Sequence, residues 1–206
     1  MPTKTVVQSC FGVDWVTARY WNTTFGSGAN HLPTETQQKT TRVVMPRLTS
    51  IEICKQYLHF SAAHFTIFSA TDRERLHGHN WRLGVEITGE IDENGLCFDY
   101  AIYKRILKDL CAKYDEYTLI AEQSPYLQIS EDDDFYHITH NGRTQPLLKT
   151  DTILMPVKNI TIEELANYFL AQLTADAVHL EALRIHAFEV RVSSGPDQWG
   201  IARWRK

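Results

Sequence analysis

A run of alternating apolar and polar residues, from Trp81 to Thr88, constrains the fold more than any other feature of the sequence. Apolar side chains occupy every second position of this run: Trp81, Leu83, Val85 and Ile87. A period of two is typical of a β-strand with one face in the core. The chain has 206 residues, of which 43% are hydrophobic, enough for one ordinary core. The sequence therefore predicts a single main domain built on a sheet with one buried face.

Several shorter runs extend this sheet. Residues 57–65 and 188–192 read as strands, and residues 199–204 read as a last strand after the turn at Gly195. Residues 96–100 are expected to resume an extended run after the turn at 92–95. Strands that are adjacent in sequence are expected to pair in antiparallel fashion.

Two helices and one hairpin are predicted between these strands. Apolar residues at helical spacing indicate a helix from about Ala101 to Tyr114. Thr161 and Glu164 form the pattern of a capping box at the start of a second helix. Asn141-Gly142, between two extended segments, is a strong hairpin signal. The order of elements favours an α+β fold with both helices on one face of the sheet.

The chain divides by composition into an N-terminal extension, residues 1–50, and a domain, residues 51–206. The extension is rich in Thr, Asn, Gly and Ser, with scattered aromatic residues that favour an ordered arm over disorder. Within the domain, residues 121–158 are expected to be an insertion that carries the hairpin.

Charge and cysteine usage exclude several classes of function. A net charge of -4 and a pI near 6.1 do not favour nucleic acid or an anionic membrane as a partner. No apolar run is long enough to span a bilayer, and the N-terminus lacks the apolar core of a signal peptide, so we expect a cytoplasmic protein. The four cysteines form no CxxC pair and do not predict a thiolate zinc site: Cys10, Cys54, Cys97 and Cys111.

Three histidines form a candidate metal site. His77 and His79 flank Gly78 at the start of a predicted strand, so their side chains point the same way. His64 ends the preceding strand, and antiparallel pairing would place it alongside them. Three neutral imidazoles with an open fourth position are the ligands of a catalytic zinc ion. Two core or surface histidines would give the same HxH pattern, so this pattern alone is weak.

Five segments together resemble the family of 6-pyruvoyl-tetrahydropterin and 6-carboxytetrahydropterin synthases. They are, in order, FSAAH, LHGHNW, GEIDENGLCFDYAIYKRILKDL, ITIEELANYF and VRVSSGPDQW. The resemblance implies the tunnelling fold, in which antiparallel sheets from several subunits close into a barrel. It also implies a homo-oligomer, usually a hexamer, with active sites between subunits. The residues that match the family's Zn²⁺ ligands are His64, His77 and His79.

The chain departs from the family at three functional positions. The loop before His77 has no cysteine, and Arg73 or Thr71 stands at the equivalent place. The family's Asp-His pair becomes Asp115-Glu116, and Ser193-Ser194 replaces the glutamate that grips the pterin. A guanidinium cannot act as a general base. Arg73 and Arg75 could instead meet an anionic substrate. The candidate bases are four carboxylates, with Glu116 preferred: Glu116, Asp115, Glu74 and Asp72.

Three hypotheses about function follow. The favoured one is a zinc-dependent lyase or cyclase acting on a non-pterin carbonyl or polyol substrate. The second is a genuine 6-carboxytetrahydropterin synthase whose catalytic groups come from elsewhere, such as Cys10 in the extension. The third is a non-catalytic relative that keeps zinc for structure or for ligand binding.

Overall fold

The computed structural model describes residues 45–206, which belong to one compact unit. Cys10 and most of the predicted N-terminal extension lie outside the described residues. No helix among residues 45–206 is long and apolar enough to cross a membrane.

The main sheet is centred on one long strand, β3 (His77–Glu90), which contains the alternating run. Along one edge of β3, β2 (His59–His64) pairs with its first half and β1 (Leu48–Ile53) with its second half. Along the other edge lies β9 (Ile185–Ser193), followed by β10 (Gly200–Arg205). All of these pairings are antiparallel, as predicted.

Beyond β2 the sheet becomes parallel, which differs from the prediction. Strand β4 (Tyr117–Ala121) pairs in parallel with β2, and β8 (Thr152–Met155) pairs in parallel with β4. The order of strands is β10-β9-β3-β2-β4-β8. Parallel neighbours need a crossover connection. The segment with α1 (Ala101–Tyr114) makes one crossover and the inserted strands make the other. The sequence predicted neither β4 nor β8 as a strand, and it predicted only antiparallel pairing.

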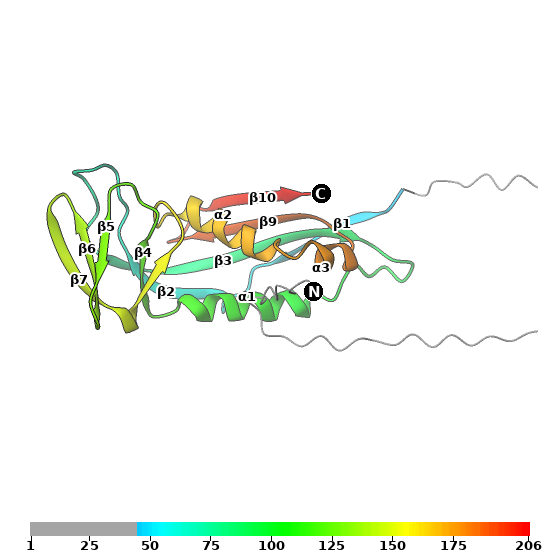
Figure 1. Ribbon diagram of the computed structural model, residues 1–206. Coiled ribbons are helices and arrows are strands. Elements are labelled where there is room, and N and C mark those ends of the chain that lie inside the picture. Colours follow the sequence, from blue (N-terminus) through cyan, green and yellow to red (C-terminus); the bar gives the residue numbers. More distant parts are fainter. Residues whose placement is uncertain (1–44) are drawn as a thin grey trace, which may run out of the picture. The chain divides into compact units, whose positions relative to one another are not determined.

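The helices cover one face of the sheet (Figure 1). Helix α1 has the predicted bounds, and the apolar residues Leu107 and Leu110 of its inner face are buried. Helix α2 (Ile162–Leu173) begins at Thr161, whose hydroxyl accepts a hydrogen bond from the Glu164 N–H. The Glu164 carboxylate accepts from the Lys158 N–H, so only half of the predicted capping box forms.

Two further differences concern short segments. Helix α3 (Ala177–Ala182) packs near β9 and was not predicted. Residues 96–100 form no strand; they connect the turn at 92–95 to α1. Their length and apolar content resemble a strand, but they have no strand partner in the described sheet.

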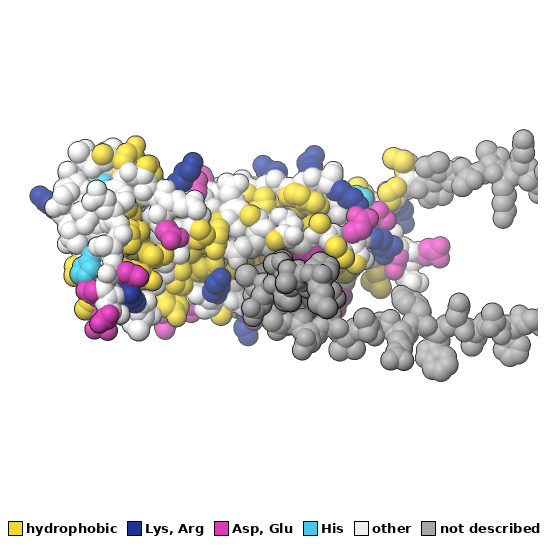
Figure 2. Space-filling model, in the orientation of Figure 1, with side chains coloured by type: hydrophobic (Ala, Val, Ile, Leu, Met, Phe, Trp, Pro, Cys, Tyr) yellow, Lys and Arg dark blue, Asp and Glu magenta, His cyan; other side chains and the backbone are white. Residues whose placement is uncertain are grey.

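The inserted region folds as a small separate sheet. Strands β5 (Gln128–Glu131), β6 (Phe135–His140) and β7 (Arg143–Leu148) pair in that order, and η1 (Lys149–Asp151) leads to β8. The predicted hairpin is confirmed, because Asn141 and Gly142 both have positive φ between β6 and β7. A second apolar cluster joins this sheet to the body: Phe65, Ile67, Ile120 and Ile138. On the face shown in Figure 2, hydrophobic side chains gather between the inserted strands and α2.

Candidate metal centre

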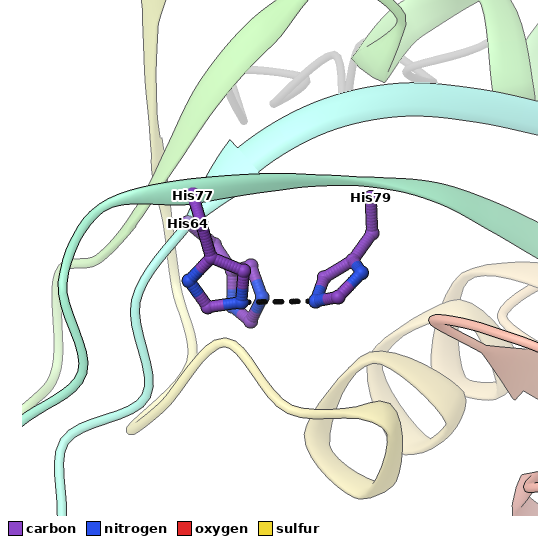
Figure 3. A group of neighbouring side chains, drawn as sticks. All are labelled: His64, His77 and His79. Carbon is purple, nitrogen blue, oxygen red and sulfur yellow. Dashed lines mark hydrogen bonds between the residues drawn. The ribbon is translucent and has the colours of Figure 1, made fainter.

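The three predicted histidine ligands lie together on one face of the sheet (Figure 3). In the β2–β3 register, His64 lies opposite His77, and His79 lies opposite Ala62. Cross-strand partners share a face, and residues two apart on a strand also share one. The ligand atoms of the three rings all lie within 4.8 Å of one another.

Backbone carbonyls determine which ring nitrogens face the centre of this cluster. His64 Nδ1 lies 2.9 Å from the Ile160 oxygen, and His77 Nδ1 lies 2.8 Å from the Arg75 oxygen. A carbonyl only accepts, so each Nδ1 carries the proton and each Nε2 of the neutral ring keeps its lone pair. His77 Nε2 and His79 Nε2 are 3.0 Å apart. Two nitrogens on one tetrahedral zinc ion are separated by about 3.3 Å.

His64 gives the clearest test of whether a cation fits here. Its Nε2 is buried and has no hydrogen-bond partner among the described residues. A buried polar atom without a partner is costly, and a metal ion would satisfy it. The donor set therefore fits a zinc ion held by His64, His77 and His79 with one position left open.

The local electrostatics favour the neutral form of His64 and of His79. Burial, outweighing the carbonyl of Ile160, lowers the pKa of His64 to about 4. Burial and the neighbouring His77 also lower the pKa of His79. Neutral imidazoles have the free lone pairs that metal binding requires.

Trp81 forms the floor beneath the histidines. Its ring is fully buried, with centroids 4.8 Å from the ring of His64 and 5.6 Å from that of His79. Its indole N–H donates to the Ala62 oxygen over 3.2 Å, which fixes the ring across β2 and β3. Strand β3 thus supplies two of the three ligands and, at Trp81, the ring that packs against them.

Glu74 is a carboxylate close enough to this cluster for its charge to act on the rings: it favours the protonated forms of His64 and His79 and so offsets part of the lowering of their pKa values by burial. Its Oε2 accepts the Thr66 N–H over 2.9 Å, and its own N–H donates to the Thr66 oxygen over 2.9 Å. Partial burial raises the pKa of Glu74, but the Thr66 hydrogen bonds and the nearby His77 and His64 outweigh it and hold the pKa below its usual value. The sequence predicted Glu74 as one of four candidate bases, but no sequence signal indicated its hydrogen bonds to Thr66.

The loop that carries Glu74 is braced from two directions. The Asn159 side chain accepts the Ile67 N–H over 3.0 Å and donates to the Ile67 oxygen over 2.8 Å. His140, at the end of β6, donates from Nε2 to the Ser69 oxygen over 2.8 Å. The inserted sheet thus helps to position the loop that precedes His77.

Arg73, predicted as a catalytic-loop residue, has a structural contact. Its guanidinium carbon lies 4.3 Å from the Phe65 ring centroid, and Nη1 donates to the main-chain carbonyl oxygen of Glu74 over 2.7 Å. These contacts orient the loop around Glu74, and a role for Arg73 with substrate stays a prediction.

The other two predicted catalytic residues lie beside β2, just before β4 begins. Glu116 lines a hollow of about 410 Å³ together with Ser61, Asn80 and His79. Asp115 Oδ1 accepts the Ser61 N–H over 2.7 Å, and the Glu116 N–H donates to the Ser61 oxygen over 2.7 Å. The role of Glu116 as a base stays a prediction.

Among residues 45–206, Ser193 and the other histidines are not part of the cluster. Ser193 is buried, and its hydroxyl donates to the Gly195 oxygen. His59 is exposed and bonds the Gln56 oxygen. His137 pairs with Asp132 and not with His140, in agreement with their opposite strand parity.

The sequence profile of the 6-pyruvoyl tetrahydropterin synthase family matches residues 52–204. This chain belongs to that family. It is 27% identical over 148 residues to a candidate 6-carboxy-5,6,7,8-tetrahydropterin synthase of Methanocaldococcus jannaschii, covering 71% of this chain and 90% of the relative.

Solved structures of the family confirm the α+β fold. The 6-pyruvoyl tetrahydropterin synthase of Plasmodium falciparum superposes with a TM-score of 0.73 at 26% identity, over 77% of this chain and 99% of that one. The Plasmodium vivax protein gives a TM-score of 0.74 at 28% identity, over 78% and 99%.

Proposed function

We propose that this chain is a zinc-dependent lyase that removes a proton from the side chain of a dihydropterin triphosphate, with Glu74 as the base. The observation that carries this proposal is the juxtaposition of an ionised carboxylate, held at Thr66, with three converging imidazole nitrogens. A zinc ion at those nitrogens would polarise a carbonyl or hydroxyl oxygen of the substrate.

Glu74 could replace the family's cysteine, which is absent from the loop before His77 in this chain. The missing cysteine is a proton-transfer group, and a carboxylate with a depressed pKa is ionised and able to accept a proton at neutral pH. Two structures of the Plasmodium vivax synthase carry substitutions at a glutamate described as a catalytic residue. A glutamate is therefore a catalytic residue in a relative with this fold, which supports a catalytic role for Glu74.

The residues of this chain divide the work as follows. The Thr66 N–H holds one oxygen of Glu74 and leaves the other free to take the proton. The C–H electron pair then forms a C=C bond to the ring, the π pair of the neighbouring ring C=N bond moves to nitrogen, and that nitrogen takes a proton from water, which gives an enol. After this enol becomes a ketone, loss of the next C–H proton to a base would form a second enol, whose electrons expel the triphosphate with its bonding pair from the adjacent carbon. Trp81 and the carbonyls of Ile160 and Arg75 keep the histidine rings in place.

A second candidate is a non-pterin carbonyl or polyol substrate, the hypothesis favoured by the sequence. One observation favours it: Ser193 is buried and bonded to Gly195, so the position that grips the pterin in the family offers no carboxylate. A hydroxyl cannot supply the paired acceptors of a carboxylate. The same zinc and Glu74 chemistry would act on this substrate.

One experiment separates the two candidates. Zinc-loaded protein is incubated with dihydroneopterin triphosphate, and products are followed by mass spectrometry. Conversion that disappears in a Glu74→Gln variant supports the proposal. No conversion by protein that holds a full complement of zinc would leave the non-pterin substrate as the better candidate.

A further inference from the structure

A hollow of about 320 Å³ lies between the loop before His77 and the tip of the inserted hairpin. One wall is formed by residues 71–76 and the other by His140, Asn141 and Arg143. We call it the basic hollow, defined by its three guanidinium groups: Arg73, Arg75 and Arg143. Glu74 and Leu76 also line it, and Leu76 directly precedes the candidate ligand His77.

The three arginines are available to a ligand. Within residues 45–206, none of them forms an ion pair. Arg75 and Arg143 are exposed, and Arg73 uses only one of its N–H donors, for the main-chain carbonyl oxygen of Glu74. A guanidinium has five N–H donors, in a fork that matches the oxygens of phosphate.

The two walls are fixed to each other by hydrogen bonds. His140 Nε2 donates to the Ser69 oxygen, and Asn141 Nδ2 donates to the Thr71 oxygen over 3.4 Å. The tight turn at Asn141 and Gly142 then places Arg143 at the first position of β7. A site whose walls are already positioned loses less conformational entropy when a ligand binds.

Two carboxylates also line the hollow, and their charges matter. Glu74 is held by the Thr66 N–H, whereas the Asp72 side chain has no partner among the described residues. Three guanidinium groups against two carboxylates leave a positive balance, and Asp72 is the group that weakens it.

We infer that the basic hollow binds a phosphate group of the substrate, beside the metal centre that acts on its uncharged part. This inference deepens the proposed function and rests on it for the identity of the substrate. Arg143 belongs to the insertion, so the inserted sheet contributes to substrate recognition as well as to the position of the loop.

Calorimetric titration of the zinc-loaded full chain with inorganic phosphate at low ionic strength tests this inference. We expect one saturable site, weakened about tenfold or more in Arg75→Gln and in Arg143→Gln, because a charge-assisted hydrogen bond is lost. Arg105→Gln, an exposed change on α1, is the matched control and should bind as the parent does. Equal affinity in the parent and in Arg143→Gln would overturn the inference.

Two more variants sharpen the result. Asp72→Asn should tighten phosphate binding, because it removes the opposing charge. His79→Ala should keep it; loss of binding there would mean that phosphate binds the metal instead. Turnover is not measured in these titrations. Phosphate binding at the arginines without turnover of dihydroneopterin triphosphate would support this inference and reject the proposed function. Turnover without phosphate binding at the arginines would support the proposed function and reject this inference.

Discussion

His64 and Ile160 lie 96 residues apart in the sequence and are joined by a hydrogen bond of 2.9 Å from the His64 ring to the Ile160 carbonyl oxygen. This bond fixes the proton on Nδ1 and points the lone pair of Nε2 toward His77 and His79. The segment before α2 therefore decides which nitrogen of His64 can bind a metal.

Zinc content should follow the three histidines. We expect purified protein to hold about one zinc ion per chain, and His64→Ala, His77→Ala or His79→Ala to lose most of it, because each removes one of three ligands. Elemental analysis measures this. His59→Ala, an exposed histidine of β2 that bonds Gln56, is the control and should keep its zinc. Full zinc in all three ligand variants would refute the assignment.

Replacement of Glu74 should abolish most activity without loss of metal. We expect Glu74→Gln to lower the turnover rate about 10²–10⁴-fold, the usual effect of removing a general base, while zinc content is unchanged. Initial rates on dihydroneopterin triphosphate measure this, with Glu93→Gln in an exposed turn as control. If Glu116→Gln caused the larger loss, Glu116 would be the base.

Asp115 should matter for stability within the chain. Its carboxylate accepts the Ser61 N–H over 2.7 Å, so Asp115→Ala leaves a strand N–H without this acceptor. We expect the free energy of unfolding to fall by about 0.5–1.5 kcal/mol. Urea denaturation measures the loss, and Asp109→Ala, an exposed change on α1, should have a smaller effect. Equal stability of the two variants would argue against this contact.

The metal-free protein should lose stability as the pH falls from 6.5 toward 4. The pKa of His64 is lowered from 6.5 to about 4. Between these pH values His64 is therefore protonated in the unfolded chain and neutral in the folded chain. Stability therefore rises with pH across this window. The pKa of Glu74 lies below 4.5, so its stabilising contribution is lost only at lower pH. Urea denaturation at several pH values should show a shallower slope for His64→Gln; an unchanged slope would contradict the prediction.

The sheet edges suggest self-association. Strands β10 and β8 each have one edge without a strand partner among the described residues. Exposed edges favour pairing with another chain, and the family resemblance points to a homo-oligomer, with a hexamer expected. Light scattering after size-exclusion chromatography at micromolar concentration measures the mass, and a monomer would count against barrel closure between subunits.

The sequence by itself predicted those features that depend on local periodicity. The alternation around Trp81 predicted β3, the helical spacing after Ala101 predicted α1, and Asn141-Gly142 predicted the hairpin. The HxH spacing also predicted that His77 and His79 share a face. Each of these follows from backbone geometry over a few residues, which the order of side chains already records.

Only the tertiary structure decided how distant segments combine. The parallel pairing of β4 and β8 depends on crossovers that no local pattern specifies. The tautomer of His64 depends on Ile160, and the position of Arg143 beside Arg75 depends on the packing of the hairpin against the loop. Glu74 and Glu116 are both acidic residues near strand ends, and their sequence contexts do not separate them. The fold holds Glu74 at Thr66, on the loop before His77, and Glu116 at Ser61, beside β2, through main-chain hydrogen bonds between segments that are distant in the sequence.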